Sequence, residues 1–272
     1  MEIKAADVAK LRKMTGAGMM DCKNALAEAQ GDFDRAQEII REKGKLIASK
    51  RADRDASEGL VVAKIVGKKA YMLCLACETD FVAKNEEFAK TANEILEAAV
   101  AADCADIDAL KNLEYNGQSI AAMVTEKSGQ TGEKIELPFY SQIEAEQVVA
   151  YIHTNKKLGT ILGFNAAISE ETAKDVAMQA AAMAPISISK ADCPADVIEK
   201  ERQIGHEQAR LDGKPEAMLD KIAEGKVNKY LSENTLLSQS FVKNPKITVD
   251  AHIKAANAEA TVVAYKRFSL ND

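Results

Sequence analysis

The sequence predicts an α+β protein with a small three-helix unit at the N-terminus. A core follows, made of two copies of an antiparallel hairpin plus a helix, with an inserted helical hairpin arm. In the first 44 residues, apolar side chains recur at helical spacing between glycines. Two later segments, 60–102 and 148–184, each show two apolar runs around a short turn and then a helical pattern. Residues 195–233 are polar and helical with one break, which is typical of a projecting helical hairpin.

Composition narrows the class of protein. A chain of 272 residues, 47% of them hydrophobic, has enough apolar material for one to three domains. The net charge of −6 argues against a chain that mainly binds nucleic acid, and we expect no specific nucleic-acid partner. No apolar run reaches the roughly 18 residues of a membrane span, and the N-terminus lacks a signal-peptide pattern. Scattered cysteines, five in number, fit a reducing compartment, so we expect a cytoplasmic protein without membrane contact.

The N-terminal unit reads as three short helices. In the first, apolar side chains including Met14 recur at a spacing of three, and the helix ends at Gly16. A second helix over 19–29 is followed by Asp32, a good N-cap for a third helix that we expect Gly44 to end. A bundle of this size buries little surface, so it is more typical of a docking unit than of an enzyme.

The glycines after the first helix do not form a phosphate loop. The segment Thr15–Gly18 lacks both the Gly-Lys-Ser/Thr ending of a P-loop and the third glycine of a dinucleotide fingerprint. The candidate contact residues beside it are Arg12, Met19 and Met20. At least one of two adjacent methionines points away from a narrow core stripe, and an exposed methionine suits an adaptable contact. The alternative, that both methionines are core residues, stays open.

Residues 45–58 predict a linker or a helical extension in which basic residues are interleaved with acids. A solvated face is the favoured interpretation of this segment, and contact between its basic part, Lys45 to Arg54, and RNA is the alternative.

The stretch 77–82 joins a buried strand to a helix. The apolar run 71–76 precedes it, and a helix with one apolar face, over 88–99, follows it. Asp80 and Phe81 stand at the turn. Taken alone, Phe81 is more typical of a core anchor than of a side chain that inserts into a partner, because most aromatic residues pack inside.

The second copy of the pattern repeats the strands and the helix but not this turn. Residues 165–169 stand where the first copy has 78–82, and they contain no acid followed by an aromatic residue. The duplicated scaffold therefore does not by itself require Asp80 and Phe81.

The remaining segments complete the predicted core and arm. Between the copies we expect a helix over 119–128, a glycine-rich turn over 129–132 and a strand over 135–143, whose proline indicates a sheet edge or a bulge. A helix after Thr248 and a strand over 261–268 end the chain. In the arm, the apolar side chains expected to lead in and back are Val197, Ile204, Ala209, Leu211, Met218, Ile222, Val227 and Leu231.

Catalytic patterns are missing from the sequence. Cys74 and Cys77 form a lone CxxC, and side chains three apart in a strand face opposite sides, so a metal or redox role is disfavoured. The three histidines fall in different elements. His153, near a hairpin turn, is more typical of a surface or half-buried residue than of a ligand, with a contact role as the alternative. We therefore expect no enzyme, no metal and no cofactor.

Two long motifs carry a resemblance to a known family. Residues 11–26, LRKMTGAGMMDCKNAL, closely resemble the N-terminal signature of the bacterial elongation factor Ts family, and residues 78–85, ETDFVAKN, resemble its second signature. Their order and separation also match, and weaker matches at 213–215 and 241–245 extend the resemblance over essentially the whole chain. It implies a guanine-nucleotide exchange factor for elongation factor Tu.

The resemblance also implies a division into domains. Residues 1–54 correspond to a docking domain similar to ubiquitin-associated domains, with a basic linker. Residues 55–140 correspond to a core N-subdomain that carries the turn, and residues 141–272 to a core C-subdomain that includes a coiled-coil arm over 190–233.

The resemblance finally assigns roles to residues. It implies that the turn displaces magnesium from the partner, that three N-terminal side chains contact the partner's GTPase domain, and that one histidine stands at a contact position. The turn consists of Thr79, Asp80, Phe81 and Val82, the N-terminal contact residues are Arg12, Met19 and Met20, and the histidine is His153. With the absence of the turn from the second copy, this favours partner insertion for Phe81. The oligomeric state is left open, including a dimer through the arm or the sheet.

Overall fold

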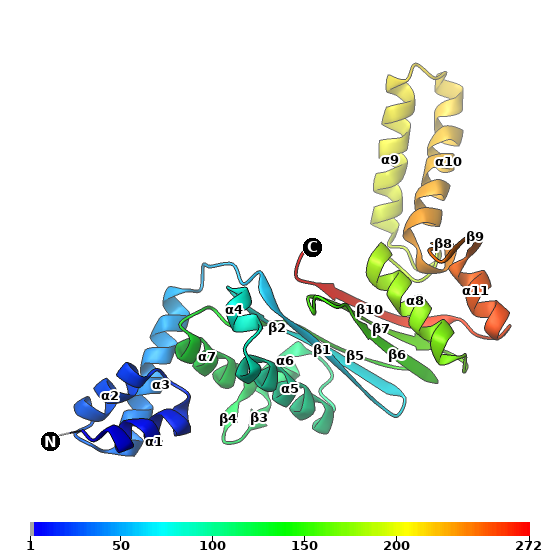
Figure 1. The fold of residues 1–272 in the computed structure, drawn as a ribbon. Coiled ribbons are helices and arrows are strands. Elements are labelled where there is room, and N and C mark those ends of the chain that lie inside the picture. Colours follow the sequence, from blue (N-terminus) through cyan, green and yellow to red (C-terminus); the bar gives the residue numbers. More distant parts are fainter. Residues whose placement is uncertain (1–2) are drawn as a thin grey trace.

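A computed structural model describes residues 3–272 of the chain. Met1 and Glu2, where the predicted docking domain begins, lie outside the described residues. Figure 1 shows a helical unit at one end, two sheets in the middle and a pair of long helices that projects away from the second sheet. No helix within residues 3–272 combines the length and the apolar character needed to cross a membrane.

The structure confirms the mixture of helices and small antiparallel sheets. The α-helices are α1 (Ala5–Thr15), α2 (Met19–Glu28), α3 (Phe33–Lys50), α4 (Asp80–Ala83), α5 (Glu86–Ala101), α6 (Ile107–Asn112), α7 (Ile120–Thr131), α8 (Glu170–Met183), α9 (Ala195–Leu211), α10 (Glu216–Asn234) and α11 (Val249–Ala256), and η1 (Leu236–Ser238) is a 3-10 turn. The strands are β1 (Glu58–Val66), β2 (Lys69–Cys77), β3 (Glu114–Tyr115), β4 (Gln118–Ser119), β5 (Glu136–Glu144), β6 (Gln147–Ile152), β7 (Leu158–Phe164), β8 (Ser240–Phe241), β9 (Asn244–Thr248) and β10 (Val262–Ser269).

Helices α1 to α3 form the N-terminal unit around buried side chains such as Leu11 and Leu26. The predicted N-cap is present, because the Asp32 carboxylate accepts hydrogen bonds from the backbone N–H groups of Asp34 and Arg35. The expectation that Met14 shares the buried face is wrong, since its side chain is exposed.

Helix α3 does not end at Gly44, as the sequence suggested, but continues to Lys50. The predicted glycine-rich turn at 129–132 is also wrong in part, because α7 extends through Gly129 to Thr131. Both glycines serve a close approach of two helices: a Cβ atom on Gly129 would lie 2.4 Å from the Gly44 Cα atom. Gly44 and Gly129 thus bring α3 against α7 and join the N-terminal unit to the core.

Two three-stranded sheets with the same strand order make up the duplicated core. The first has the order β1-β2-β5, and the second has the order β6-β7-β10 with β7 in the centre. Helix α5 packs on the first sheet with its predicted face buried, and α8 packs on the second. Pro138 lies in the edge strand β5, next to a register shift against β2, as predicted.

Strand β2 is apolar after Lys69 because both of its faces are covered. Tyr71, Leu73, Leu75 and Cys77 point into a cluster with α5, whereas Met72, Cys74 and Ala76 belong to a cluster shared with the second sheet. The two sheets therefore pack through one face each, and the central strand reads as a continuous apolar run for that reason.

The arm formed by α9 and α10 has the predicted break at 212–215, but its packed face is partly different. Ile204, Leu211 and Met218 are exposed. Small side chains line the helix contact instead, and a Cβ atom on Gly205 would lie 3.2 Å from the Ala223 Cα atom. The short elements α6, β3, β4, β8 and β9 were not anticipated, because each is too short to show a period.

Candidate functional site

The turn after β2 is a single helical turn, α4, that presents Phe81 to solvent. The Thr79 hydroxyl accepts a hydrogen bond from the Val82 backbone N–H at 3.4 Å and so begins the helix. The Phe81 side chain is 85% exposed, so the core-anchor interpretation is wrong. Val82, in contrast, packs partly against the first core cluster. The turn thus has one apolar side chain that anchors it and one that projects from it.

Asp80 stabilises the same turn from its exposed side. Its carboxylate accepts a hydrogen bond from Lys84 Nζ at 2.6 Å, four residues further on. This contact holds the pKa of Asp80 below its ordinary value. Asp80 is therefore a carboxylate at neutral pH, close to the base of the exposed phenyl ring.

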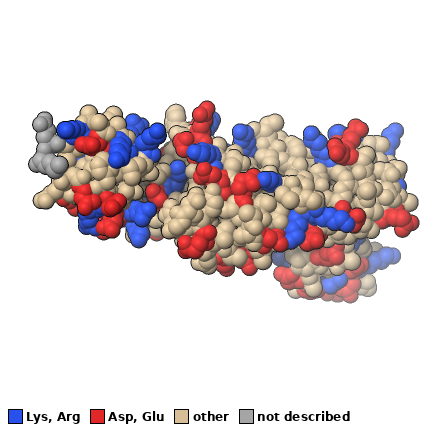
Figure 2. Space-filling view, turned by 90° about the horizontal axis from the view of Figure 1, so that it is seen from below, with Lys and Arg blue, Asp and Glu red and all other residues tan. Residues whose placement is uncertain are grey.

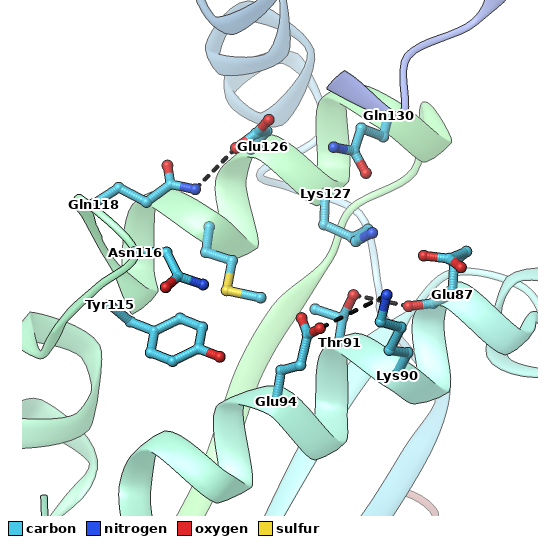
Figure 3. A pocket seen from close by; sticks show the side chains of 11 residues that line it. Glu87, Lys90, Thr91, Glu94, Tyr115, Asn116, Gln118, Glu126, Lys127 and Gln130 are labelled. Atoms are coloured by element: carbon cyan, nitrogen blue, oxygen red, sulfur yellow. Dashed lines mark hydrogen bonds and ion pairs between the residues drawn. The ribbon is translucent and has the colours of Figure 1, made fainter. Parts of the chain in front are cut away.

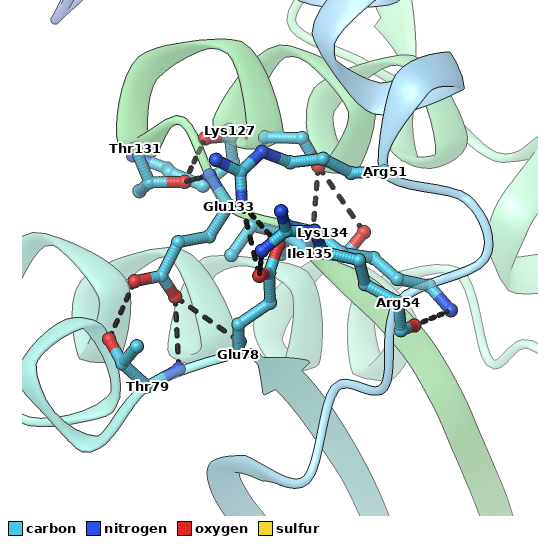
Figure 4. A network of polar contacts seen from close by, with 10 residues as sticks. Arg51, Arg54, Glu78, Thr79, Lys127, Thr131, Glu133, Lys134 and Ile135 are labelled. Atoms are coloured by element: carbon cyan, nitrogen blue, oxygen red, sulfur yellow. Dashed lines mark hydrogen bonds and ion pairs between the residues drawn. The ribbon is translucent and has the colours of Figure 1, made fainter.

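A second carboxylate, from a distant part of the chain, holds the turn from behind. Glu133 accepts hydrogen bonds from the backbone N–H groups of Glu78 at 3.2 Å and Thr79 at 3.0 Å, and from the Thr79 hydroxyl at 2.6 Å. Figure 4 shows these contacts between the carboxylate and the end of β2. Glu133 follows α7 after Gly132, so the turn is tied to a neighbouring helix.

Glu78 extends this polar network to the N-terminal unit. Its carboxylate accepts hydrogen bonds from Arg51 at 2.8 and 3.0 Å, from Arg54 at 3.2 Å and from the Lys134 backbone N–H at 2.6 Å (Figure 4). Burial raises the pKa of Glu78, but the Lys134 amide and the two guanidinium groups outweigh it and lower the pKa overall. Part of the basic segment 45–54, for which the sequence favoured a solvated face over RNA contact, therefore makes contacts within the chain.

A groove on one side of the turn brings in the N-terminal unit. Arg12 and Gly16 line it together with Val82 and Asn85, and Gln130 also contributes. The Gln130 side-chain amide donates to the Thr15 backbone oxygen at 2.6 Å and closes one end. The structure thus places Arg12 in the same groove as the turn, although about 70 residues separate them in the chain.

A hollow on the other side involves the second sheet. Asp80, Ala83 and Lys84 line it together with the loop 154–157 that connects β6 and β7. The Lys156 backbone oxygen accepts a hydrogen bond from the Val61 N–H at 2.7 Å, which fixes this loop against the first sheet. In α4 the residues 80, 83 and 84 share one side and 82 and 85 share the other, as helical spacing requires.

His153 stands where β6 enters that loop, half-buried, and does not itself line the hollow. Its Nδ1 atom lies 2.9 Å from the Tyr151 hydroxyl. Met19 and Met20 are 58% and 63% exposed at the start of α2, so neither is a core residue. With Met14 they give the N-terminal unit an exposed group of flexible apolar side chains.

A further hollow lies between α5 and α7. Figure 3 shows it lined by charged and amide side chains, among them Glu94, Glu126 and Lys127. Burial lowers the pKa of Lys127, although nearby glutamates act in the opposite direction. Glu126 accepts a hydrogen bond from Gln118 at 3.0 Å.

The cysteines of β2 and the possible metal-ligating groups within the described residues 3–272 bear on the metal or redox role that the sequence disfavours. No group of three His, Cys, Asp or Glu residues within 3–272 is placed to hold a metal ion. Cys74 and Cys77 are buried on opposite faces of β2, as their spacing predicted. Burial raises the pKa of Cys77 to about 12, so its thiol is protonated at neutral pH.

Comparisons with known proteins agree over the whole chain. The sequence profile of a family described as "Elongation factor TS" matches residues 78–272. A protein named elongation factor Ts from Azobacteroides pseudotrichonymphae is 48% identical and covers 100% of this chain and 99% of its own. Proteins of the same name from Porphyromonas gingivalis and Christiangramia forsetii are 46% and 44% identical, with 99% or more of each chain covered.

Proposed function

The chain belongs to the elongation factor Ts family, and we propose that it binds elongation factor Tu in its GDP-bound form and promotes exchange of GDP for GTP. The observation that carries this proposal is Phe81, an 85% exposed aromatic side chain on a turn that the rest of the fold holds in place. An exposed aromatic side chain of this kind is typical of a contact with a partner.

The proposed exchange requires no bond-breaking chemistry by this chain. GDP and Mg²⁺ occupy a polar pocket of the partner, where the ion bridges phosphate and protein oxygens. A factor that binds the nucleotide-free partner more tightly than the GDP-bound partner must weaken GDP binding by the same ratio. Each tenfold change requires about 1.4 kcal/mol of differential binding. A role in translation also places the chain in the cytoplasm.

Within this proposal, the turn distorts the magnesium site of the partner. Phe81 inserts between partner side chains and displaces the element that holds the ion. Asp80 fixes the turn through Lys84 and forms polar contacts with the partner. Thr79 begins the helical turn, and Val82 anchors it to the first core cluster. The groove beside Val82 and the hollow beside Asp80 leave both sides of the turn open to a partner surface.

The docking residues supply binding energy that offsets this distortion. Met19 and Met20 present adaptable apolar contact area, and Arg12 lies in the groove next to the turn. His153 stands at the entrance to the loop that borders the hollow on the other side. These side chains come from both ends of the proposed contact surface, so a partner that reaches all of them spans the turn.

Nucleotide release tests the proposal. Phe81→Ala is expected to slow the release of fluorescent GDP from elongation factor Tu more than tenfold, a loss of about 1.4 kcal/mol or more. The affinity for the nucleotide-free partner should fall by a smaller factor than the rate of GDP release. Ile65→Ala removes another exposed apolar side chain at the far end of the β1–β2 hairpin and should leave release unchanged. Unchanged release with Phe81→Ala excludes the insertion role.

An RNA-binding role through residues 45–54 is the alternative, and the structure weakens it. Arg51 and Arg54 pair with Glu78. Figure 2 shows acidic and basic side chains interspersed over the face it presents, without a continuous basic stripe. The RNA-binding hypothesis predicts that the chain binds RNA with a strong dependence on salt and has no effect on nucleotide release.

A further inference from the structure

We propose that Glu133 is a positioning residue: its carboxylate holds the turn 79–82 in the conformation that presents Phe81 to the partner. The proposal rests on the exchange function proposed above and concerns how this chain prepares its contact residue. Glu133 lies outside both motifs, 54 residues from Thr79, and its carboxylate accepts hydrogen bonds from residues 78 and 79.

The turn needs support from the rest of the fold because it forms few stabilising contacts within itself. Helix α4 spans four residues and none of them is buried. A single helical turn fixes several backbone dihedral angles for few hydrogen bonds, so it is unstable without outside contacts. The exposed Phe81 ring gains no packing energy in the free protein. Val82 and Ala83, both only partly buried, are the apolar side chains with which α4 packs against the core.

The geometry of Glu133 fits this supporting role. An ionised carboxylate only accepts hydrogen bonds, and here it meets two backbone N–H donors and one hydroxyl donor from residues 78 and 79. Hydrogen bonds to a carboxylate are stronger than neutral ones. By accepting from the Thr79 hydroxyl at 2.6 Å, Glu133 also orients the oxygen that receives the Val82 N–H. The carboxylate thus acts on the first residues of α4 itself.

The backbone of Glu133 is itself fixed at the end of α7. The Glu133 N–H donates to the Thr131 hydroxyl at 3.2 Å, and Gly132 ends α7 in the left-handed region with φ of 72°. Helix α7 packs against α3 through the glycine pair described above. The support for the turn therefore comes from a packed helix rather than from a free loop.

Nucleotide release and local hydrogen exchange test the proposal together. Glu133→Ala is expected to slow the GDP release that this chain stimulates from the partner about tenfold, while Glu133→Gln, which keeps one acceptor oxygen, slows it about threefold. Glu136→Gln is the matched control, because Glu136 lies three residues further on, pairs with Lys134 and does not reach the turn. With that control, the partner should release GDP at the wild-type rate.

A double-mutant cycle separates positioning from a general loss of structure. If Glu133 acts through Phe81, the effect of Glu133→Ala should shrink to less than twofold in the Phe81→Ala background. An undiminished tenfold effect in that background overturns the proposal, as does wild-type release with Glu133→Ala alone.

Amide hydrogen exchange of the free protein gives a readout that does not depend on the partner. Glu133→Ala should speed exchange at residues 79–83 by about tenfold or more and leave β7 unchanged. Unchanged hydrogen exchange at the turn contradicts the proposal, even if the wild-type chain proves not to stimulate GDP release from the partner. If the wild-type chain does not stimulate GDP release but Glu133→Ala speeds hydrogen exchange at the turn, only the proposed nucleotide-exchange function is overturned.

Discussion

Glu78 shows how a single carboxylate is made tolerable in a nearly buried position. Its side chain is 12% exposed, and such a charge is costly unless partners replace the lost water. Two guanidinium groups and one amide N–H do so, and they come from the segment that follows α3 and from the segment between α7 and β5. Glu78 therefore joins the N-terminal unit to the residue that directly precedes the turn.

The charge of Glu78 predicts a dependence of stability on pH. Because its pKa is lowered in the folded state, its contribution is fully present above its ordinary pKa of 4.5. It is lost as the pH falls through the lowered value. Glu78→Gln should reduce the free energy of unfolding by about 2 kcal/mol at pH 7 and by much less at pH 3.

Denaturant unfolding at pH 7, 5 and 3 measures this difference. Glu97→Gln is the control, since Glu97 is 57% exposed and pairs with Lys64 at the surface, where an ion pair contributes little. A constant difference between wild type and Glu78→Gln across the three pH values contradicts the assigned role of the charge.

At the same scale, the sequence singled out the candidate contact residues but not the residues that support them. Phe81 could be singled out because an acid–aromatic pair at a strand end is absent from the second copy and matches a family motif. Glu133 could not, because hydrogen bonds to Thr79 depend on a tertiary approach that no local pattern records. Arg51 and Arg54 looked like solvated charges for the same reason.

Among the elements, those with a clear period were predicted well and glycines were misread. The buried face of α5 follows from helical spacing, and the burial of β2 follows from its continuous apolar run. Gly44 and Gly129 were taken as a helix end and a turn, since glycine serves those purposes most often. Here they remove side chains at a helix crossing, and only the partner helix reveals that use.

This crossing predicts opposite effects for two glycine substitutions. Gly129→Ala should destabilise the protein by about 1–3 kcal/mol, because the new Cβ atom would lie 2.4 Å from a backbone atom of α3. Gly225→Ala, in the exposed part of α10 with no atom within 4 Å of its Cβ position, should stabilise by about 0.5–1 kcal/mol. Thermal unfolding of both variants measures the contrast, and equal effects would falsify the close-packing account.

On the scale of the whole molecule, the two copies each have a core cluster and share a further cluster between their sheets. Val61 and Met72 of the first sheet share a cluster with Ile161 of the second, and Phe139 stacks on Phe268 with ring centroids 4.8 Å apart. The sequence predicted the duplication, and the continuous apolar run of β2 indicated that both of its faces are covered. It did not indicate what covers the second face, because apolar strands give no signal of their partner.

The shared cluster predicts that a mutation in one copy weakens both. Ile161 is fully buried between the sheets, so Ile161→Ala should reduce the free energy of unfolding by about 2–5 kcal/mol. Amide hydrogen exchange should then accelerate in β2 as well as in β7, because the two strands lose protection together. Leu26→Ala is the matched control: Leu26 is equally buried but belongs to the N-terminal cluster, and its loss should accelerate exchange in α1 to α3. Acceleration confined to β6, β7 and β10 with Ile161→Ala would mean that the two sheets open independently. In that case the loop 154–157 would not hold a fixed place beside the turn, since the Lys156 contact with Val61 joins the two sheets.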